Sequence, residues 1–275
     1  MVSRLIDHYI ITRFNLRPST ANAAALEPAW LQARAALFET FCLPTVRAQT
    51  STDFTWLLLF DQATPAQFRE RIQEWARWPL IRPLFLEAGS EDVGRLAVKT
   101  AMQRVPDLLL TTRLDNDDGL ACDYVETIRR LDSVNSPTVF EFPYGYVWQS
   151  GRAYRDRQDN NPFVTLAEPL ARNPLAHFST VYCGDHHESY KLGRMIRVSD
   201  KPGWLQVVHG GNLANRARGI RAPVATLKGR FHLPETLLST KESAWEILSD
   251  QLKTGLTQSA RRGWRILRNT RRLLP

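Results

Sequence analysis

The most chemically informative stretch of this sequence is Asp-Asn-Asp-Asp at residues 115–118, which is separated by four residues from the apolar run 108–110 before it. In an extended chain, side chains two residues apart point the same way, so we expect Asp115 and Asp117 to project together. Two carboxylates this close repel each other, and both stay ionised at neutral pH when a cation lies between them. Hard oxygen ligands suit Mg²⁺ or Mn²⁺, which proteins usually hold through one or two carboxylates together with substrate phosphates. The spacing therefore predicts a divalent-metal site that receives a nucleotide diphosphate.

The same acidic stretch is compatible with roles that need no divalent metal. Aspartates near a helix N-terminus complement the helix dipole, so the stretch could be a solvated turn or a helix start. An aspartate at a strand end could also carry a covalent phosphate. A calcium loop of the EF-hand type fails on register, because its required glycine position is occupied by Leu120.

Strands and helices alternate around these residues. Apolar and β-branched runs predict strands at residues 9–14, 56–60, 81–86 and 108–110. Apolar positions at helical spacing predict helices over residues 30–41, after Thr64-Pro65, after Ser90 and over 123–131. Such alternation favours a mostly parallel sheet covered by helices on both faces. Ligands of these α/β folds bind at the carboxyl ends of the strands, where the acidic stretch lies.

The rest of the chain differs in character. Residues 1–135 form the predicted nucleotide-binding half, and residues 136–235, rich in aromatic strand signals, form a predicted antiparallel, loop-rich acceptor half on the same sheet. Residues 236–275 are predicted to be a helical basic tail. The last 25 residues carry seven Lys and Arg and no acid, so most of the net charge of +8 belongs to them.

Composition excludes several classes of protein. With 275 residues, 43% hydrophobic and 23% charged, the chain is neither disordered nor collagenous. Its longest apolar runs are far shorter than the roughly 20 residues of a membrane-spanning helix. Asp7 and His8 lie where a signal peptide needs apolar residues, so we expect a cytoplasmic location.

The sequence resembles the GT-A class of nucleotide-sugar glycosyltransferases, and more closely a family of bacterial rhamnosyltransferases. Five stretches carry the resemblance in the order that the family has them, at residues 10–15, 38–50, 53–61, 112–119 and 203–212. Together they span about residues 8–235. The resemblance implies a GT-A-like, Rossmann-like fold and transfer of a sugar from a nucleotide diphosphate to a hydroxyl acceptor, with rhamnose suggested by the family name and bacterial surface glycan as the setting.

The resemblance also implies roles for the acidic stretch and for a late histidine. Mn²⁺ or Mg²⁺ would bridge Asp115 and Asp117 to the donor diphosphate, and Asp118 would support this site. His209, which is followed by two glycines, would be a further metal ligand. A hydrogen-bonded histidine with a purely structural role is the alternative for this position.

An inverting enzyme of this class needs a base that deprotonates the acceptor hydroxyl. The titratable segment 185–188 lies about 70 residues past the metal motif, as the base does in many such enzymes. Asp185 is the first candidate and His186 the second. A zinc site is a competing interpretation, but neighbouring histidines point apart on a strand and lack zinc-site spacing.

The donor nucleotide should lie over the ends of the first strands. The residues that we place there are Arg13, Asp61, Arg95, Lys99, Arg113 and Asn212, together with Asp118. For the basic ones, a surface ion pair is the more frequent role.

The basic tail offers a second kind of partner. At helical spacing Arg261, Arg265, Arg268 and Arg272 share one face. Leu256, Ala260, Trp264 and Leu267 form an adjoining apolar stripe. Residues 251–275 could therefore bind an anionic membrane surface, which would place the enzyme at the inner face of the membrane beside a glycan or lipid-linked acceptor. A non-catalytic protein that binds nucleic acid through the tail is the alternative function. Because the body is nearly neutral, we expect no nucleic-acid partner. A catalytically silent partner subunit is a third interpretation.

Overall fold

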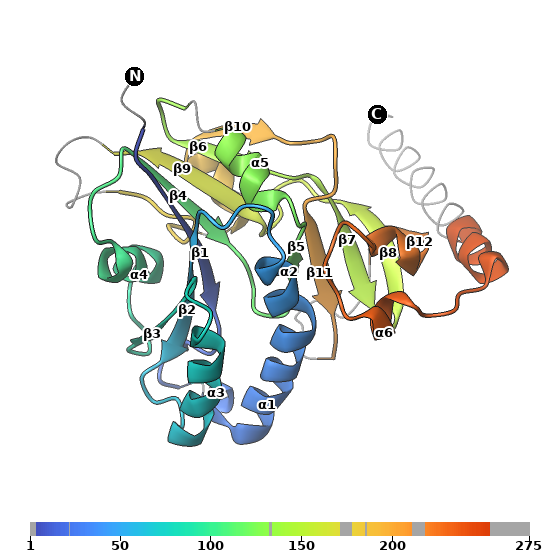
Figure 1. Cartoon of the computed structure of the whole chain (residues 1–275), viewed down its shortest axis with the longest axis horizontal. Helices are drawn as coiled ribbons and strands as arrows, with labels where there is room; N and C mark the ends of the chain where they lie inside the picture. The colour runs from blue at the N-terminus through green and yellow to red at the C-terminus, as the bar shows by residue number, and fades with distance from the viewer. Residues whose placement is uncertain are drawn as a thin grey trace, which may run out of the picture.

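The computed structural model describes residues 4–21, 23–131, 134–170, 178–184, 186–210 and 218–253. Its strands form two sheets that lie side by side (Figure 1). The strands are β1 Ile6–Arg13, β2 Thr55–Asp61, β3 Ile81–Leu86, β4 Leu108–Arg113, β5 Gly119–Leu120, β6 Thr138–Glu141, β7 Tyr144–Gln149, β8 Arg152–Arg157, β9 Val164–Pro169, β10 Arg194–Arg197, β11 Trp204–Val208 and β12 Ile220–Ala222. The labelled helices are α1 Pro28–Leu37, α2 Leu43–Arg47, α3 Ala66–Ala76, α4 Val93–Ala101, α5 Tyr124–Arg130 and α6 Glu235–Leu238, with short helical turns at η1 Ala24–Leu26, η2 Phe38–Cys42, η3 His186–Lys191 and η4 Val224–Leu227. An unlabelled helix covers residues 244–253.

The larger sheet has seven strands in the order β10-β6-β9-β4-β1-β2-β3. β3, β2, β1 and β4 run parallel to one another, β10 runs parallel to β6, and β9 is antiparallel to both of its neighbours. The predicted mixed α/β fold with a mostly parallel sheet flanked by helices is therefore confirmed. Three strands that follow residue 135 complete this sheet, so the two halves that we predicted share it.

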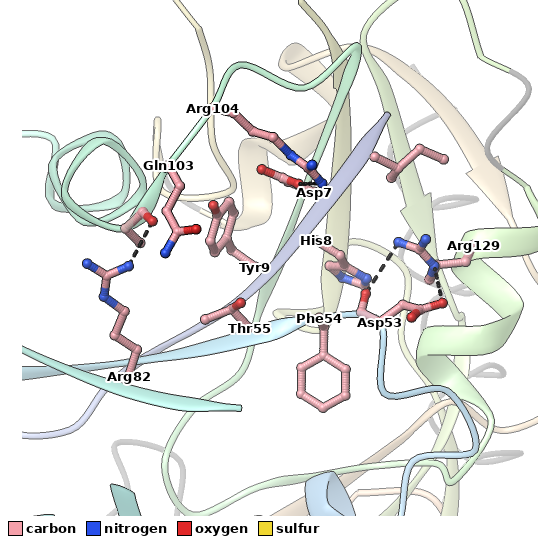
Figure 2. Close-up of a pocket in the computed structure, with 12 residues that line it drawn as sticks. Asp7, His8, Tyr9, Asp53, Phe54, Thr55, Arg82, Gln103, Arg104 and Arg129 are labelled. Carbon is pink, nitrogen blue, oxygen red and sulfur yellow. Dashed lines mark hydrogen bonds and ion pairs between the residues drawn. The ribbon is translucent and has the colours of Figure 1, made fainter. Parts of the chain in front are cut away.

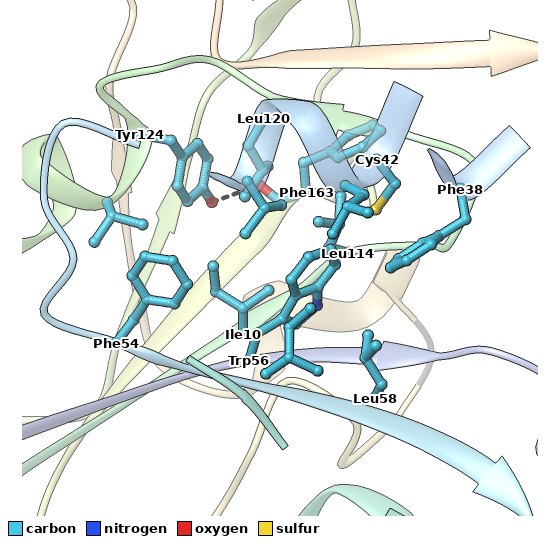
Figure 3. Close-up of a cluster of buried hydrophobic side chains, with 14 of the residues drawn as sticks. Ile10, Phe38, Cys42, Phe54, Trp56, Leu58, Leu114, Leu120, Tyr124 and Phe163 are labelled. Carbon is cyan, nitrogen blue, oxygen red and sulfur yellow. Dashed lines mark hydrogen bonds between the residues drawn. The ribbon is translucent and has the colours of Figure 1, made fainter. Parts of the chain in front are cut away.

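Alternation along the parallel strands divides the core between the two faces of this sheet. Ile10, Leu58 and Leu110 belong to a cluster with residues of α1, η2, α3 and α5 (Figure 3). Residues one position along, such as Ile11 and Leu57, pack with α4 on the other face. Side chains of a strand alternate in direction, so these uninterrupted apolar runs fill both layers.

The smaller sheet has five strands in the order β12-β8-β7-β11-β5. All of its pairs are antiparallel except β7 with β11. Residues of η4 and the segment that follows it pack on this sheet around Trp148, Leu205 and Phe231. Its strands come from residues 119–222, so the antiparallel portion predicted after residue 136 draws one short strand from the first half.

Two predicted elements differ from the structure at prolines. The aromatic strand signals predicted after residue 136 begin with the segment 138–148, which is two strands, because Pro143 separates β6 from β7. The helix predicted over residues 30–41 passes into a π-helical turn, in which the Leu43 N–H donates to the carbonyl oxygen of Phe38. Pro44 follows and has no N–H to continue the α-helical pattern at this point.

A buried histidine lies near the amino end of β1. His8 is almost wholly buried, and its Nε2 lies 2.7 Å from the Thr112 hydroxyl oxygen. It lines a cavity of about 590 Å³ at the amino ends of β1 and β2, together with Asp53 and Arg129 (Figure 2). Burial, with a contribution from the positive charge of Arg129, lowers the pKa of His8 to about 3. The imidazole is therefore neutral in the folded protein at neutral pH.

The free energy of unfolding should fall as the pH drops below 6.5, the ordinary pKa of a histidine. Between this value and the lowered one, the unfolded chain takes up a proton at His8 and the folded chain does not, which favours unfolding. The loss from this group should reach about 2 kcal/mol near about pH 5. Urea unfolding of the wild type and of His8→Gln, at neutral pH and at about pH 5, measures this loss. Between the two conditions the free energy of unfolding of the variant should fall by about 2 kcal/mol less than that of the wild type. An equal loss in both proteins would contradict the assignment.

Candidate functional site

The acidic stretch forms a turn between β4 and β5. The backbone N–H of Asp118 donates to the carbonyl oxygen of Asp115 at 3.2 Å, so the chain is not extended here and our reason for a common direction of Asp115 and Asp117 is wrong. The two side chains also differ in environment. Asp115 is 39% exposed and lies 3.5 Å from the Arg113 Nε, whereas Asp117 is 8% exposed.

Two groups from distant segments hold the Asp117 carboxylate. Its Oδ2 accepts a hydrogen bond from the Arg34 guanidinium at 2.7 Å and lies 2.8 Å from His209 Nε2. Burial raises the pKa of Asp117, but the hydrogen bond from His209 and the charge of Arg34 outweigh burial and hold this pKa below its ordinary value. Asp117 is therefore an ionised carboxylate inside the protein. It contacts His209, the histidine to which the family resemblance assigns a role in the same site.

Pairing between the shortest strand and β11 brings Asp117 and His209 together. β5 is antiparallel to β11, with Leu205 opposite Gly119, so the turn before β5, which contains Asp117, runs alongside the end of β11, which His209 follows. β11 is fixed on its other side by Trp204, whose ring covers Gly145 of β7 so closely that an added Cβ would lie 2.0 Å from it. The Trp204 Nε1–H donates to the Phe142 carbonyl oxygen at 2.8 Å. Packing of the smaller sheet thus sets the position of His209.

Arg34 is a site residue that our sequence reasoning missed. It comes from α1 and also donates to the Asn116 Oδ1 at 3.1 Å, while the Asn116 amide donates to the Phe14 carbonyl oxygen at 2.7 Å. These bonds tie the acidic turn to α1 and to the end of β1. The sequence offers one signal: Arg34 is a polar residue within an otherwise apolar helical pattern. Exposed arginines commonly occupy such positions, so this signal says little about a role in the site.

Asp118 has a different environment from the rest of the turn. Its carboxyl is buried, and its Oδ1 accepts a hydrogen bond from the Val207 N–H at 2.8 Å. Burial raises the pKa of Asp118 well above its ordinary value, and the negative charges of Asp117 and Asp115 raise it further. This side chain fastens the turn to β11, which fits the supporting role implied by the resemblance better than direct contact with a donor.

Two predicted donor-binding arginines meet at the carboxyl ends of β1 and β4. The guanidinium carbons of Arg13 and Arg113 lie 5.1 and 5.5 Å from the ring centroid of Tyr182. Arg113 also lies beside Asp115. Burial and the nearby Asp115 carboxylate raise the pKa of Tyr182 to about 12. Tyr182, which the sequence did not single out, thus gathers two cations next to the acidic turn.

The other predicted donor contacts engage neighbouring protein groups. The buried Asp61 carboxylate forms an ion pair with Arg17 at 2.8 Å. Burial raises the pKa of Asp61, but hydrogen bonds from Arg17 and from a backbone N–H outweigh it, so this pKa lies below its ordinary value. Arg95 donates to the Phe178 carbonyl oxygen at 2.9 Å and pairs with Asp92. Lys99, one turn further along α4, is exposed.

Some predicted residues lie where the structure gives no account of them. Asp185 and Asn212 are outside the described residues, and so are residues 254–275 of the basic tail. His186 begins the short helical turn η3, and nothing is described of its side chain. Their roles stay predictions.

The donor atoms at the acidic turn suit a divalent cation that a substrate helps to bind. Across the described ranges, no three or more His, Cys, Asp or Glu side chains gather into a group able to hold a metal ion. Asp117 and His209 are in contact, however, and Asp115 lies in the same turn. The carboxylate oxygens of this turn, together with diphosphate oxygens, are chemically suitable ligands for Mn²⁺ or Mg²⁺.

Comparison with known families identifies the chain. A model of the family described as "Putative rhamnosyl transferase" matches residues 12–221, more than half of the sequence. The chain belongs to this family. The match confirms the resemblance found in the sequence, and the matched region contains the acidic turn, His209 and Arg34.

Solved structures show a more distant likeness. Residues 1–349 of TarS from S. aureus, in complex with UDP-GlcNAc, share 13% identity with a TM-score of 0.47, over 77% of this chain and 61% of that one. A mannosyltransferase, PcManGT from Pyrobaculum calidifontis, in complex with GDP-Man and Mn²⁺, shares 12% identity with a TM-score of 0.43, over 77% of this chain and 59% of that one. This chain thus spans about three fifths of the length of these relatives.

Two further comparisons have negative results. No curated protein sequence matches this chain. In the part of the chain that the structure describes, no helix has both the length and the apolar character needed to cross a membrane.

Replacing Arg34 tests the buried ion pair. Arg34→Gln should lower the free energy of unfolding at neutral pH by about 1–3 kcal/mol, because the buried Asp117 carboxylate loses a charged partner. Arg47→Gln, which changes an exposed arginine of α2, is the matched control and should change stability by about 0.5 kcal/mol or less. Urea unfolding measures both, and equal stabilities of the two variants would contradict the energetic role of Arg34.

Proposed function

We propose that this protein is a metal-dependent glycosyltransferase that moves a sugar from a nucleotide diphosphate donor to a hydroxyl acceptor. The observation that carries the proposal is the ionised Asp117 carboxylate in contact with His209 at the carboxyl end of β4. Membership of the family supports the class of reaction. In sheets of this kind, ligands bind beyond the carboxyl ends of the strands, where this pair lies.

The donor diphosphate would lie between the acidic turn and the cations around Tyr182. Asp115, Asp117 and His209 would hold Mn²⁺ or Mg²⁺, which neutralises negative charge that develops on the departing nucleotide diphosphate. Arg13 and Arg113 would face the same phosphates and stabilise that charge directly. Because Tyr182 contacts both arginines and Asp115 pairs with Arg113, little reorganisation is needed when the donor binds.

The acceptor side of the reaction needs a base. In this proposal Asp185 takes the proton of the acceptor hydroxyl, with His186 as the second candidate. Both residues follow Tyr182 closely in the chain, and the Tyr182 ring lies against Arg113 beside the acidic turn. Rhamnose as the donor sugar belongs to the proposal because it fits the family's description. Bacterial surface glycan as the setting is carried over from the resemblance found in the sequence.

Loss of the central carboxylate tests the proposed function. Asp117→Asn should lower sugar transfer by about 100-fold or more, because the amide carries no charge to bind a cation. The assay follows release of nucleoside diphosphate from a panel of nucleotide sugars with and without Mn²⁺. Asp53→Asn, an exposed aspartate remote from the turn, is the control and should retain activity. Full activity of Asp117→Asn with unchanged dependence on Mn²⁺ would exclude the metal assignment.

The predicted base can be tested separately from donor binding. Asp185→Asn should reduce kcat by about 10² to 10⁴, the range typical of a lost general base, and leave donor affinity nearly unchanged. Isothermal titration with the cognate nucleoside diphosphate and Mn²⁺ measures the affinity. If His186→Gln shows this loss of kcat and Asp185→Asn does not, the roles of the two candidates are exchanged.

A further inference from the structure

The helix at residues 244–253 has its apolar side turned away from the protein. Trp245, Leu248 and Leu252 are 74%, 46% and 57% exposed, and their spacing places them on one face. Amphipathic helices of globular proteins normally turn this face toward the core. None of these three side chains belongs to the hydrophobic clusters of the described residues.

Polar contacts hold the opposite side of this helix against the smaller sheet. The Gln251 side chain donates to the Arg221 carbonyl oxygen at 2.7 Å, and the Asp250 carboxylate lies 3.6 Å from Arg152 and 3.8 Å from Arg221. Just before the helix, Glu242 pairs with the buried Arg221 and accepts a hydrogen bond from the Val224 N–H at 2.6 Å. Arg221 and Val224 lie in β12 and η4. These bonds keep the helix in an orientation that exposes its apolar face.

The charge of the chain that follows indicates what this face meets. Lys253 is exposed, and residues 254–275 contain six arginines and no acid. A second copy of the chain would bring two such cationic segments together, which opposes pairing through this face. Nucleic acid would attract the cations but leave the leucines in water. A surface with apolar depth and negative charge satisfies both features.

We propose that the exposed face of Trp245, Leu248 and Leu252 docks this protein on an anionic membrane surface. The apolar side chains enter the boundary between headgroups and acyl chains, and the exposed Lys253 lies where it can contact lipid phosphates. Glu246, which is exposed, flanks this face by about a quarter turn and so leaves its centre apolar. The proposal is independent of the sugar-transfer activity proposed above.

Co-sedimentation of the full chain with vesicles tests this docking. Wild type should bind phosphatidylcholine vesicles that contain phosphatidylglycerol, and should bind pure phosphatidylcholine much more weakly. Trp245→Ser/Leu252→Ser should lower the partition coefficient on anionic vesicles by about tenfold or more. Val105→Ser/Tyr190→Ser removes two exposed apolar side chains elsewhere and should bind like wild type.

Each other outcome would overturn the proposal. Equal binding of wild type and Trp245→Ser/Leu252→Ser would show that the apolar face takes no part. A dimer that forms without lipid and is lost in this variant would assign the face to a second copy. Retention of both proteins on single-stranded RNA, with no vesicle binding by either, would assign the cations to nucleic acid. Circular dichroism and the melting temperature confirm that the variants are folded.

Discussion

The buried negative charge of Asp117 constrains the rest of this structure. An ionised carboxylate that leaves water without partners costs several kcal/mol, so folding has to supply them. Here one partner, Arg34, comes from α1, and the other, His209, follows β11. These segments are far apart in the sequence, and they meet only when the larger sheet, its covering helix and the smaller sheet are all assembled. The interaction therefore depends on the whole domain and not on a local motif.

Three carboxyl groups within four residues are tolerated because their environments differ. Asp115 is partly in water beside Arg113, Asp117 is paired with Arg34 and His209, and Asp118 is buried against a backbone N–H. The opposite pKa shifts of Asp117 and Asp118 follow from these environments. Separation of neighbouring titratable groups in this way is a common property of sites that bind and react. The Asp115 side chain of this turn thus reaches solvent, while the Asp118 carboxyl fastens the turn to β11.

Periodicity predicted most of the larger sheet because each strand or helix there is strongly apolar. The local apolar pattern is enough to predict the strands around Ile10, Leu58 and Leu110 and the helices that cover them. The turn at Asp115 was misjudged because a turn and an extended strand end have the same composition. Arg34 and Tyr182 were missed because their roles depend on long-range approach, which no spacing along the chain reveals. The family resemblance, in contrast, linked Asp117 with His209 across 92 residues, and these two side chains are in contact.

The smaller sheet relates the acidic turn to the exposed helix. β5 and β11, which carry the turn and His209, lie at one side of this sheet, and β12 and β8, which hold the helix at residues 244–253, lie at the other. Four strand spacings separate the two edges, which corresponds to about 19 Å. The five hydrogen-bonded strands between the helix and the acidic turn resist stretching. A surface that bound the helix would therefore lie at a fixed distance from the acidic turn. The polar contacts of Arg221 thus have a geometric consequence as well as an energetic one, since they fix the orientation of the helix relative to the acidic turn.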